Sequence, residues 1–125
     1  MQNETMENNK TELIIYQSKN GDIKLDVSLK DETVWLTANQ MALIFNRDEK
    51  VIRKHINNVF NDDELDKENN TQKMRVDGVK QSVAFYSLDV ILAVGYRVNS
   101  KKTTEFRIWA TKILKEYMII NGWIL

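Results

Sequence analysis

The sequence predicts an α+β fold with an N-terminal β-hairpin or small antiparallel sheet, a helix-turn-helix, a second β-hairpin, a short apolar helix and a long C-terminal helix. Three observations predict it. Residues 12–17 and 22–29 are rich in β-forming side chains and are separated by Asn20-Gly21, a typical hairpin turn. Residues 37–60 contain apolar side chains at helical spacing in two successive segments. Residues 101–120 carry one helical stripe, made of Phe106, Trp109, Ala110, Ile113, Tyr117 and Ile120.

The second β-rich run alternates apolar with polar residues, as a half-buried strand does. Its apolar members are Ile23, Leu25, Val27 and Leu29. Asp31 and Glu32 then turn the chain into a short apolar segment, residues 34–36. We expect that segment to lead directly into the first helix.

Polar residues at defined positions mark the two short helices. Thr37 and Gln40 form a Thr-x-x-Gln capping box at the start of the first helix. Asn46 tolerates the left-handed conformation that a tight turn needs, and Asp48 can cap the second helix. The inward face of the second helix is Ile52, Ile56, Val59 and Phe60.

A second hairpin and a short helix follow an acidic stretch, residues 62–68. Residues 72–76 and 81–86 are the predicted strands, joined through Asp77-Gly78. Ser87 can cap a very apolar helix, and we expect Gly95 to end that helix.

Length and composition indicate one domain. Residues 1–11 have almost no apolar content, so we expect a mobile tail followed by a single helix-turn-helix-containing domain over residues 12–125. Without cysteine the chain has neither disulfides nor thiolate metal ligands, and His55 alone cannot form a zinc site. We therefore expect no metal and no cofactor.

The chain has a formal net charge of zero, but the charge is unevenly distributed. Residues 1–36 and 62–68 are acidic, whereas residues 46–60 and 95–116 are basic. A neutral chain can thus still present a basic surface. The apolar runs are too short for a transmembrane helix and the N-terminus is polar, so we expect no membrane association and a cytoplasmic location.

The helix pair has the pattern of a DNA-binding helix-turn-helix, in which the second helix lies in the major groove. The small Ala42 stands four residues before the turn, where close helix packing requires it. The candidate DNA-binding residues here are Arg47, Glu49, Lys50, Arg53, Lys54 and Asn57. Lysine and arginine can donate to guanine or phosphate, asparagine suits adenine, and Glu49 could accept from cytosine. A solvated amphipathic helix in a purely structural hairpin has the same pattern.

A second basic segment precedes the long helix. Arg97, Lys101 and Lys102 are candidate phosphate ligands, because the N-terminus of a helix offers free backbone N–H groups to an anion. The alternative is an ordinary solvated loop.

Three segments carry a family resemblance: VWLTANQMALIF, RDEKVIRKHINNVF and FYSLDVILAVGYRVNSKKTTEFRIWATKILKEY. They resemble the RhuM virulence-protein family of bacteria, from about Leu13 to the end of the chain. The most specific part is YSLDVILAVGYRVNS followed by FRIWA. Members of that family are usually longer, so the resemblance implies the N-terminal half of a longer protein.

The layout is also similar to the Bro-N type of domain in phage antirepressors, where a Phe-x-x-Trp helix follows a basic loop. Phe106 and Trp109 occupy those positions here. Both resemblances imply a DNA-binding or regulatory module carried on mobile elements.

We therefore expect site-specific binding of double-stranded DNA by a transcriptional or mobile-element regulator. Because no catalytic constellation can be assembled, we do not expect an enzyme. A single recognition helix reads few base pairs, so we expect a homodimer, formed through the apolar end of the C-terminal helix with Tyr117 and Trp123.

Two alternatives remain open. The domain could be a protein-interaction module of the antirepressor kind, with the helix-turn-helix as a scaffold. It could also target an enzyme located in a further part of the protein.

Overall fold

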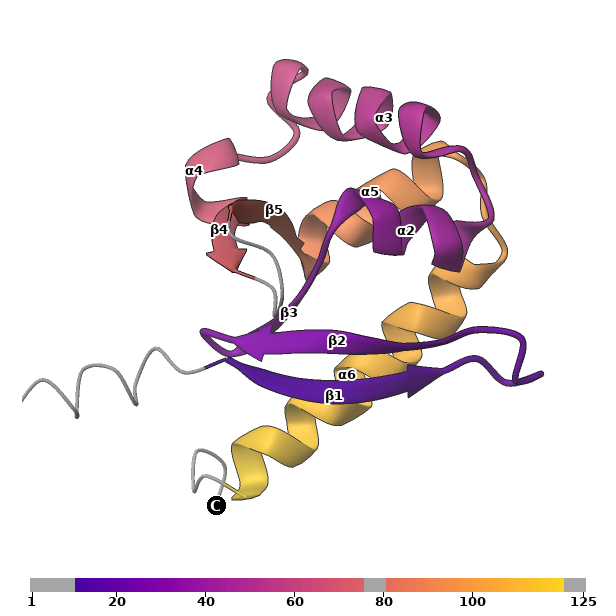
Figure 1. The fold of residues 1–125 in the computed structure, drawn as a ribbon, viewed down its shortest axis with the longest axis vertical. Coiled ribbons are helices and arrows are strands. Elements are labelled where there is room, and N and C mark those ends of the chain that lie inside the picture. The colour runs from indigo at the N-terminus through magenta and orange to yellow at the C-terminus, as the bar shows by residue number, and fades with distance from the viewer. Residues whose placement is uncertain (1–10, 76–80, 121–125) are drawn as a thin grey trace, which may run out of the picture.

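The computed structural model describes residues 11–75 and 81–120, and Figure 1 shows their arrangement. The strands are β1 (Glu12–Gln17), β2 (Lys24–Lys30), β3 (Thr33–Leu36), β4 (Thr71–Arg75) and β5 (Ser82–Ser87). The helices are α2 (Ala38–Phe45), α3 (Glu49–Asn61), α4 (Lys67–Asn70), α5 (Leu88–Arg97) and α6 (Lys102–Ile120). The predicted α+β class is confirmed. The Asp77-Gly78 turn and all but one residue of the predicted tail lie outside the described residues.

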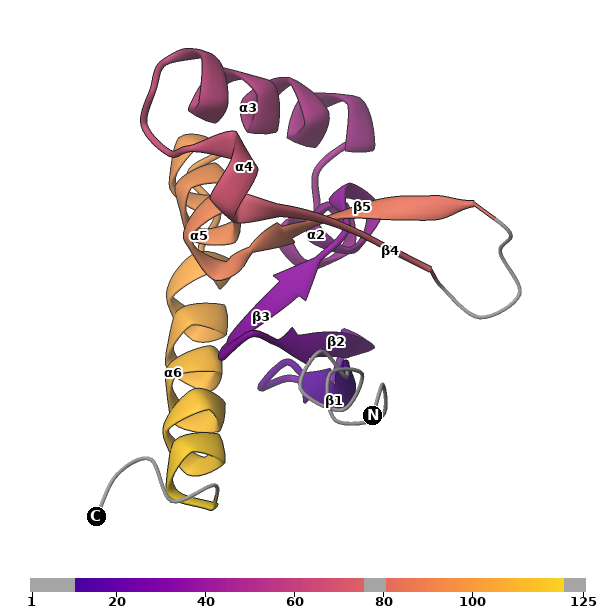
Figure 2. The same cartoon turned by 90° about the vertical axis from the view of Figure 1, so that its left-hand side faces the viewer.

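The two predicted hairpins are parts of one antiparallel sheet with strand order β1-β2-β3-β5-β4. β3 joins them by pairing with β5, Trp35 opposite Ser87 and Leu36 opposite Tyr86. Figure 2 shows the hairpin of β4 and β5 projecting away from α6, while β1, β2 and β3 lie beside α6. In both views α3 is an outer layer over α2 and α5.

The two turns that connect β1, β2 and β3 contain residues in the left-handed conformation where the chain reverses. Gly21 (φ 77°) closes the turn between β1 and β2, and its N–H donates to the Ser18 carbonyl at 2.9 Å. Asp31 and Glu32 both have positive φ, 53° and 67°, the conformation that a two-residue turn needs to match the twist of the strands.

Aromatic packing attaches this sheet to the long helix. The buried Tyr16 ring of β1 meets Phe106 and Trp109 of α6 edge-on, with centroid distances of 5.2 and 5.0 Å. Such edge-to-face pairs add about 0.5–1.5 kcal/mol beyond the apolar area that they bury. The predicted stripe on α6 therefore faces the core at its N-terminal end, whereas Ile120 at the other end is exposed.

All three predicted helix caps are present. Thr37 Oγ1 accepts from Gln40 N–H at 3.1 Å, while Gln40 Oε1 accepts from Thr37 N–H at 3.0 Å, which completes the capping box. Asp48 accepts from the Lys50 N–H at 2.8 Å, and Ser87 caps α5. Within the acidic stretch, α4 was not predicted; it is a single turn capped by Asp66.

The prediction that Gly95 ends the apolar helix is wrong. α5 continues to Arg97, and the chain reverses at Asn99, which has the left-handed φ of 56°. Gly95 instead provides space for close packing. A Cβ atom there would lie 2.4 Å from Thr103 Oγ1 of α6 and 2.9 Å from Phe45 Cζ of α2.

Within residues 11–75 and 81–120, none of the helices combines the length and the hydropathy that a membrane-spanning segment requires.

We predict that Gly95→Ala destabilises the protein by about 1–3 kcal/mol, because the added methyl overpacks the contact of α5 with Thr103 and Phe45. An unobstructed helical glycine would give the opposite sign, a gain of about 1 kcal/mol from helix propensity. Urea unfolding followed by circular dichroism measures the difference, with Thr104→Ala on the exposed face of α6 as the control. A stabilised Gly95→Ala protein would contradict the close approach.

Candidate nucleic-acid interface

The pair α2–α3 is joined by a turn of three residues, Asn46, Arg47 and Asp48. Asn46 adopts the predicted left-handed conformation (φ 55°, ψ 54°), and the Arg47 N–H donates to the Ala42 carbonyl at 3.1 Å. These two features end α2 sharply, so that α3 can begin at once in a new direction. The inward side chains of both helices enter the common core, Ile44 and Phe45 from α2 and Ile52, Ile56 and Val59 from α3.

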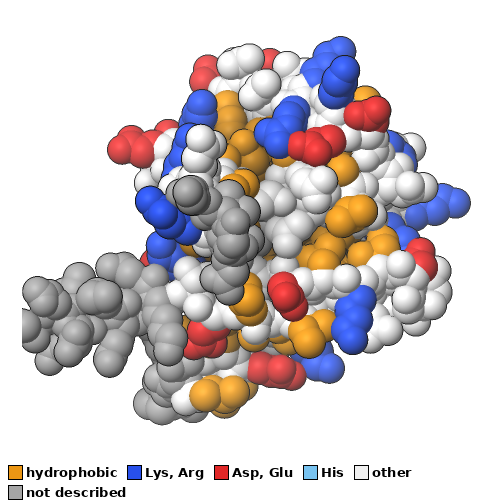
Figure 3. Space-filling model, viewed as in Figure 1, with side chains coloured by type: hydrophobic (Ala, Val, Ile, Leu, Met, Phe, Trp, Pro, Cys, Tyr) orange, Lys and Arg blue, Asp and Glu red, His pale blue; other side chains and the backbone are white. Residues whose placement is uncertain are grey.

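The outward face of α3 carries polar and basic side chains at helical spacing. Lys50, Lys54 and Asn57 are exposed at i, i+4 and i+7, on the side opposite the buried residues. Neither lysine forms an ion pair with any residue that the structure describes. Figure 3 shows lysine and arginine side chains over α3. These cations are therefore available to an anionic partner.

Arg53, at the edge of this face, forms hydrogen bonds along one edge of its guanidinium only. Its Nε donates to Glu49 Oε2 at 2.9 Å and its Nη2 donates to the same oxygen. Glu49 Oε1 accepts from Asn39 Nδ2 of α2 at 3.3 Å. The hydrogen bonds from Arg53, and then that from Asn39, lower the pKa of the Glu49 carboxyl, which is ionised at neutral pH. Both carboxylate oxygens already accept a hydrogen bond within the protein, and the predicted acceptance from cytosine stays a prediction.

Arg47 lies in the turn but is directed at the protein. Its Nη1 donates to the carbonyls of Phe45 and Asn46, at 3.0 and 3.1 Å, and its Nη2 donates to the Val98 carbonyl at 2.8 Å. It thus satisfies carbonyls at the C-terminal ends of two helices, α2 and α5. These hydrogen bonds give Arg47 a structural role, which local sequence could not reveal because Val98 is far away in the chain. Its predicted DNA contact stays a prediction.

Arg97 lies on α5 rather than in a loop, and two carboxylates of the acidic stretch hold it. Its Nη2 is 3.1 Å from Asp62 Oδ2 and 3.0 Å from Glu64 Oε1. The hydrogen bonds with Glu64 and with Asp62 raise the pKa of the guanidinium further. Arg97 therefore does not contribute an uncompensated charge to an anion site.

Lys102 is similarly paired, whereas Lys101 is not. Lys102 Nζ lies 3.5 Å from Asp22 Oδ1 and 3.9 Å from Glu105 Oε1, which links the turn between β1 and β2 to the start of α6. Lys101 is exposed and has no ion pair among the described residues. Of the three residues predicted to clamp phosphate, only Lys101 keeps a free charge.

The segment that carried the most specific resemblance, from Tyr86 to Ser100, forms the end of β5, α5 and the turn into α6. Comparison with protein families matches this half of the molecule. Residues 64–125 match the model of the Virulence protein RhuM family. This confirms the predicted RhuM resemblance over that span.

The RhuM match runs from just before α4 to the end of the chain. It does not include α2 and α3, so the candidate interface lies outside the matched residues. No curated protein and no solved structure matches the chain. The similarity to Bro-N domains stays a prediction.

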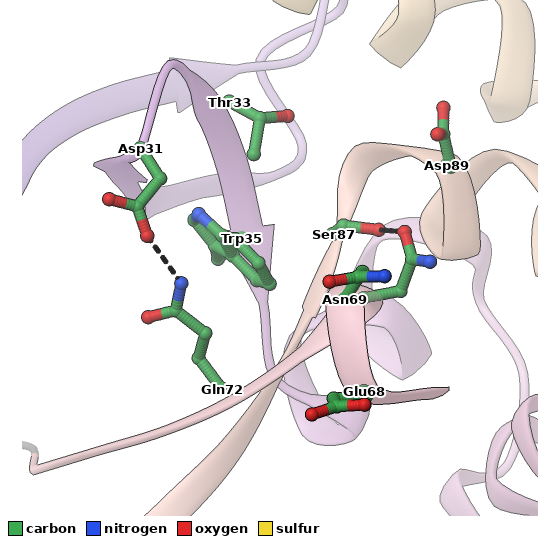
Figure 4. Close-up of a pocket in the computed structure, with 9 residues that line it drawn as sticks. Asp31, Thr33, Trp35, Glu68, Asn69, Gln72, Ser87 and Asp89 are labelled. Atoms are coloured by element: carbon green, nitrogen blue, oxygen red, sulfur yellow. Dashed lines mark hydrogen bonds between the residues drawn. The ribbon is translucent and has the colours of Figure 1, made fainter. Parts of the chain in front are cut away.

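A polar pocket lies where the RhuM-matched residues meet the turn between β2 and β3 (Figure 4). Its volume is about 420 Å³, and its lining residues are Asp31, Thr33, Trp35, Glu68, Asn69, Asn70, Gln72, Ser87 and Asp89. Three of these are carboxylates and none is basic, so the pocket is unsuited to a phosphate. No group of three or more His, Asp or Glu residues within the described ranges could hold a metal ion.

Two basic residues of the RhuM-matched part were not among the residues predicted to bind DNA. Lys73 and Arg75 are exposed at alternate positions of the edge strand β4 and form no ion pair with the described residues. The face in Figure 3 shows basic side chains beside β4 as well as over α3. The sequence pattern that could have identified Lys73 and Arg75 was their spacing of two residues on the predicted strand 72–76, which places both on one face.

We predict that Arg47→Ala lowers the free energy of unfolding by about 1–2 kcal/mol, because it removes charge-assisted hydrogen bonds to three carbonyls. Lys50→Ala, a nearby exposed cation without an ion pair, is the control and should change it by less than about 0.5 kcal/mol. Equal effects of the two substitutions in urea unfolding would argue against the structural role of Arg47.

Proposed function

We propose that α2 and α3 form a helix-turn-helix that binds double-stranded DNA site-specifically, with α3 entering the major groove. On this proposal the chain is a non-catalytic, cytoplasmic regulator of transcription or of a mobile element. The observation that supports this most is the exposed stripe of Lys50, Lys54 and Asn57 on a helix that forms the outer layer of the fold. A stripe of cations and an amide is what a reading helix requires.

The dimensions of α3 are suitable. Its 13 residues give a length of about 20 Å, and the major groove, about 12 Å wide, admits a helix. The N-terminal half carries the cations and the next turn carries Asn57, so phosphates and base edges could be contacted together. The buried residues Ile52, Ile56 and Val59 hold the opposite side of α3 to the protein.

The proposed footprint is smaller than the sequence predicted. Arg97 and Lys102 are neutralised by neighbouring carboxylates, and Arg47 is bonded to backbone carbonyls. The interface is then centred on α3, and in the second basic segment only Lys101 forms no ion pair with the described residues. A local basic patch on a neutral chain favours modest affinity for nonspecific DNA, since that affinity comes almost entirely from phosphate contacts.

We predict that changing both Lys50 and Lys54 to Ala weakens binding to all duplexes and lowers the slope of log K against log salt by up to about two. Fluorescence anisotropy at several salt concentrations measures this on a duplex selected from a random-sequence library. The control replaces Lys112 and Lys115, two exposed lysines of α6, and removes the same charge from a different surface. An equal fall in slope for both variants would mean that α3 is not the DNA-binding surface, and absence of binding to any duplex would overturn the proposal.

We also propose that the chain is a homodimer through the end of α6. Ile119 and Ile120 support this, because they are 53% and 82% exposed. Tyr117 is half-buried against the core and can contribute only partly, and Trp123 lies outside the described residues. Dimerisation would cover these apolar side chains and hold two α3 helices at a fixed separation.

For this assembly we predict that light scattering across a dilution series gives twice the chain mass of 14.7 kDa. We also predict that replacing both Ile119 and Ile120 with Glu shifts the protein to monomer. A buried charge without a partner disfavours association. Ile108→Glu, at another exposed position of α6, controls for added charge alone. A monomeric parent protein at every concentration would rule the dimer out.

One observation favours the alternative of a protein-interaction module. Leu43 of α2 is 58% exposed and Val51 of α3 is 40% exposed, so the helix pair also presents apolar side chains. Figure 3 shows hydrophobic side chains open to view below α3. Loss of partner binding on Leu43→Asp, with DNA binding absent throughout, would favour this second function.

A further inference from the structure

The guanidinium of Arg53 is held along one of its two donor edges. Nε and Nη2 form the side-on edge, and both donate to Glu49 Oε2. The end-on edge, formed by Nη1 and the remaining hydrogen of Nη2, meets no acceptor among the described residues. Because the side chain is 56% exposed, this free edge is accessible from solvent.

Glu49 is itself held by the neighbouring helix. Asn39 Nδ2 of α2 donates to Glu49 Oε1 at 3.3 Å, so the chain of contacts runs from α2 through Glu49 to Arg53. Asn39, Glu49 and Arg53 are called the relay below. The relay restrains the flexible Arg53 side chain through hydrogen bonds to residues of both helices. It therefore reduces the side-chain entropy that Arg53 would lose on binding.

We propose that the relay presents the end-on edge of Arg53 to a guanine, with Arg53 as the specificity-determining residue and Glu49 and Asn39 as positioning residues. This inference rests on the proposed DNA binding and names the base that α3 selects. Guanine presents two adjacent acceptors, N7 and O6, in the major groove, and two parallel N–H groups match them.

Glu49 also favours guanine over phosphate as the partner of Arg53. The Glu49–Arg53 pair carries no net charge, so its attraction for a phosphate is weak compared with that of the unpaired Lys50 and Lys54. A hydrogen bond to the neutral acceptors of guanine depends on geometry more than on net charge. Lys50 and Lys54 would therefore supply phosphate affinity, and Arg53 would supply the discrimination between bases.

The first experiment identifies the base. A duplex is selected from a random-sequence library with the full chain, and each guanine is replaced in turn by 7-deazaguanine, which lacks the N7 acceptor but still pairs with cytosine. At one guanine we expect the affinity to fall about tenfold, within the range for losing part of a bidentate contact. The ratio of the two affinities is the specificity ratio used below.

The variants then test the relay through that ratio. Arg53→Lys keeps the charge but loses the planar fork, so it should bring the ratio close to one while retaining nonspecific binding. Glu49→Gln should lower the ratio severalfold, because the neutral amide holds Arg53 less firmly, and Asn39→Ala should lower it less. Glu116→Gln, an exposed acid on α6, removes the same charge and should leave the ratio unchanged.

The outcomes separate the inference from the function on which it rests. If Glu49 only repelled phosphate, Glu49→Gln would strengthen binding to both duplexes equally and leave the ratio intact, which would overturn the relay. DNA binding with no guanine sensitive to 7-deazaguanine would overturn the base assignment and leave the proposed function standing. Failure to bind any duplex would remove both. Thermal unfolding of each variant confirms that the fold is retained.

Discussion

The pairing of β3 with β5 is the contact on which the arrangement of the helices depends. Only two residue pairs make it, Trp35 with Ser87 and Leu36 with Tyr86. α2 begins directly after β3, and α5 directly after β5. The two pairs lie at the C-terminal ends of both strands, where each strand leads into its helix. The pairing therefore places α2 and α5 near each other, and α3 packs over both. The candidate interface is therefore supported by a sheet contact that contains none of its residues.

Close packing within this helix layer imposes a second constraint. Gly95 lets α5 approach Thr103 and Phe45 at a distance that no larger residue would allow. Thr103 is buried and donates to the Ser100 carbonyl at 2.9 Å, so the turn from α5 into α6 is fixed at the same place. Arg47 connects that turn to the one between α2 and α3 through the Val98 carbonyl. The orientation of α3 is thus the product of packing at both of its supporting helices.

The charged residues show how position decides role. In sequence, Arg47, Lys50, Arg97 and Lys102 are equivalent cations in two basic segments. In the fold, Arg97 and Lys102 meet carboxylates from the acidic stretch and from the first hairpin turn, Arg47 meets carbonyls, and Lys50 meets solvent. The roles proposed on α3 follow from this difference in surroundings: the unpaired Lys50 and Lys54 bind phosphate, and Arg53, held by Glu49, binds guanine.

The sequence by itself determined the local structure: the caps at Thr37, Asp48 and Ser87, the left-handed Asn46, and the apolar stripes of α3 and α6. These depend on backbone geometry and on side chains a few residues apart, so short-range patterns suffice to predict them. The tertiary structure alone decided that the two hairpins share one sheet, that Gly95 is a packing contact within α5, and which cations stay free. Each of these depends on partners distant in the chain, such as Glu64 for Arg97 and Asp22 for Lys102, which no local pattern can specify.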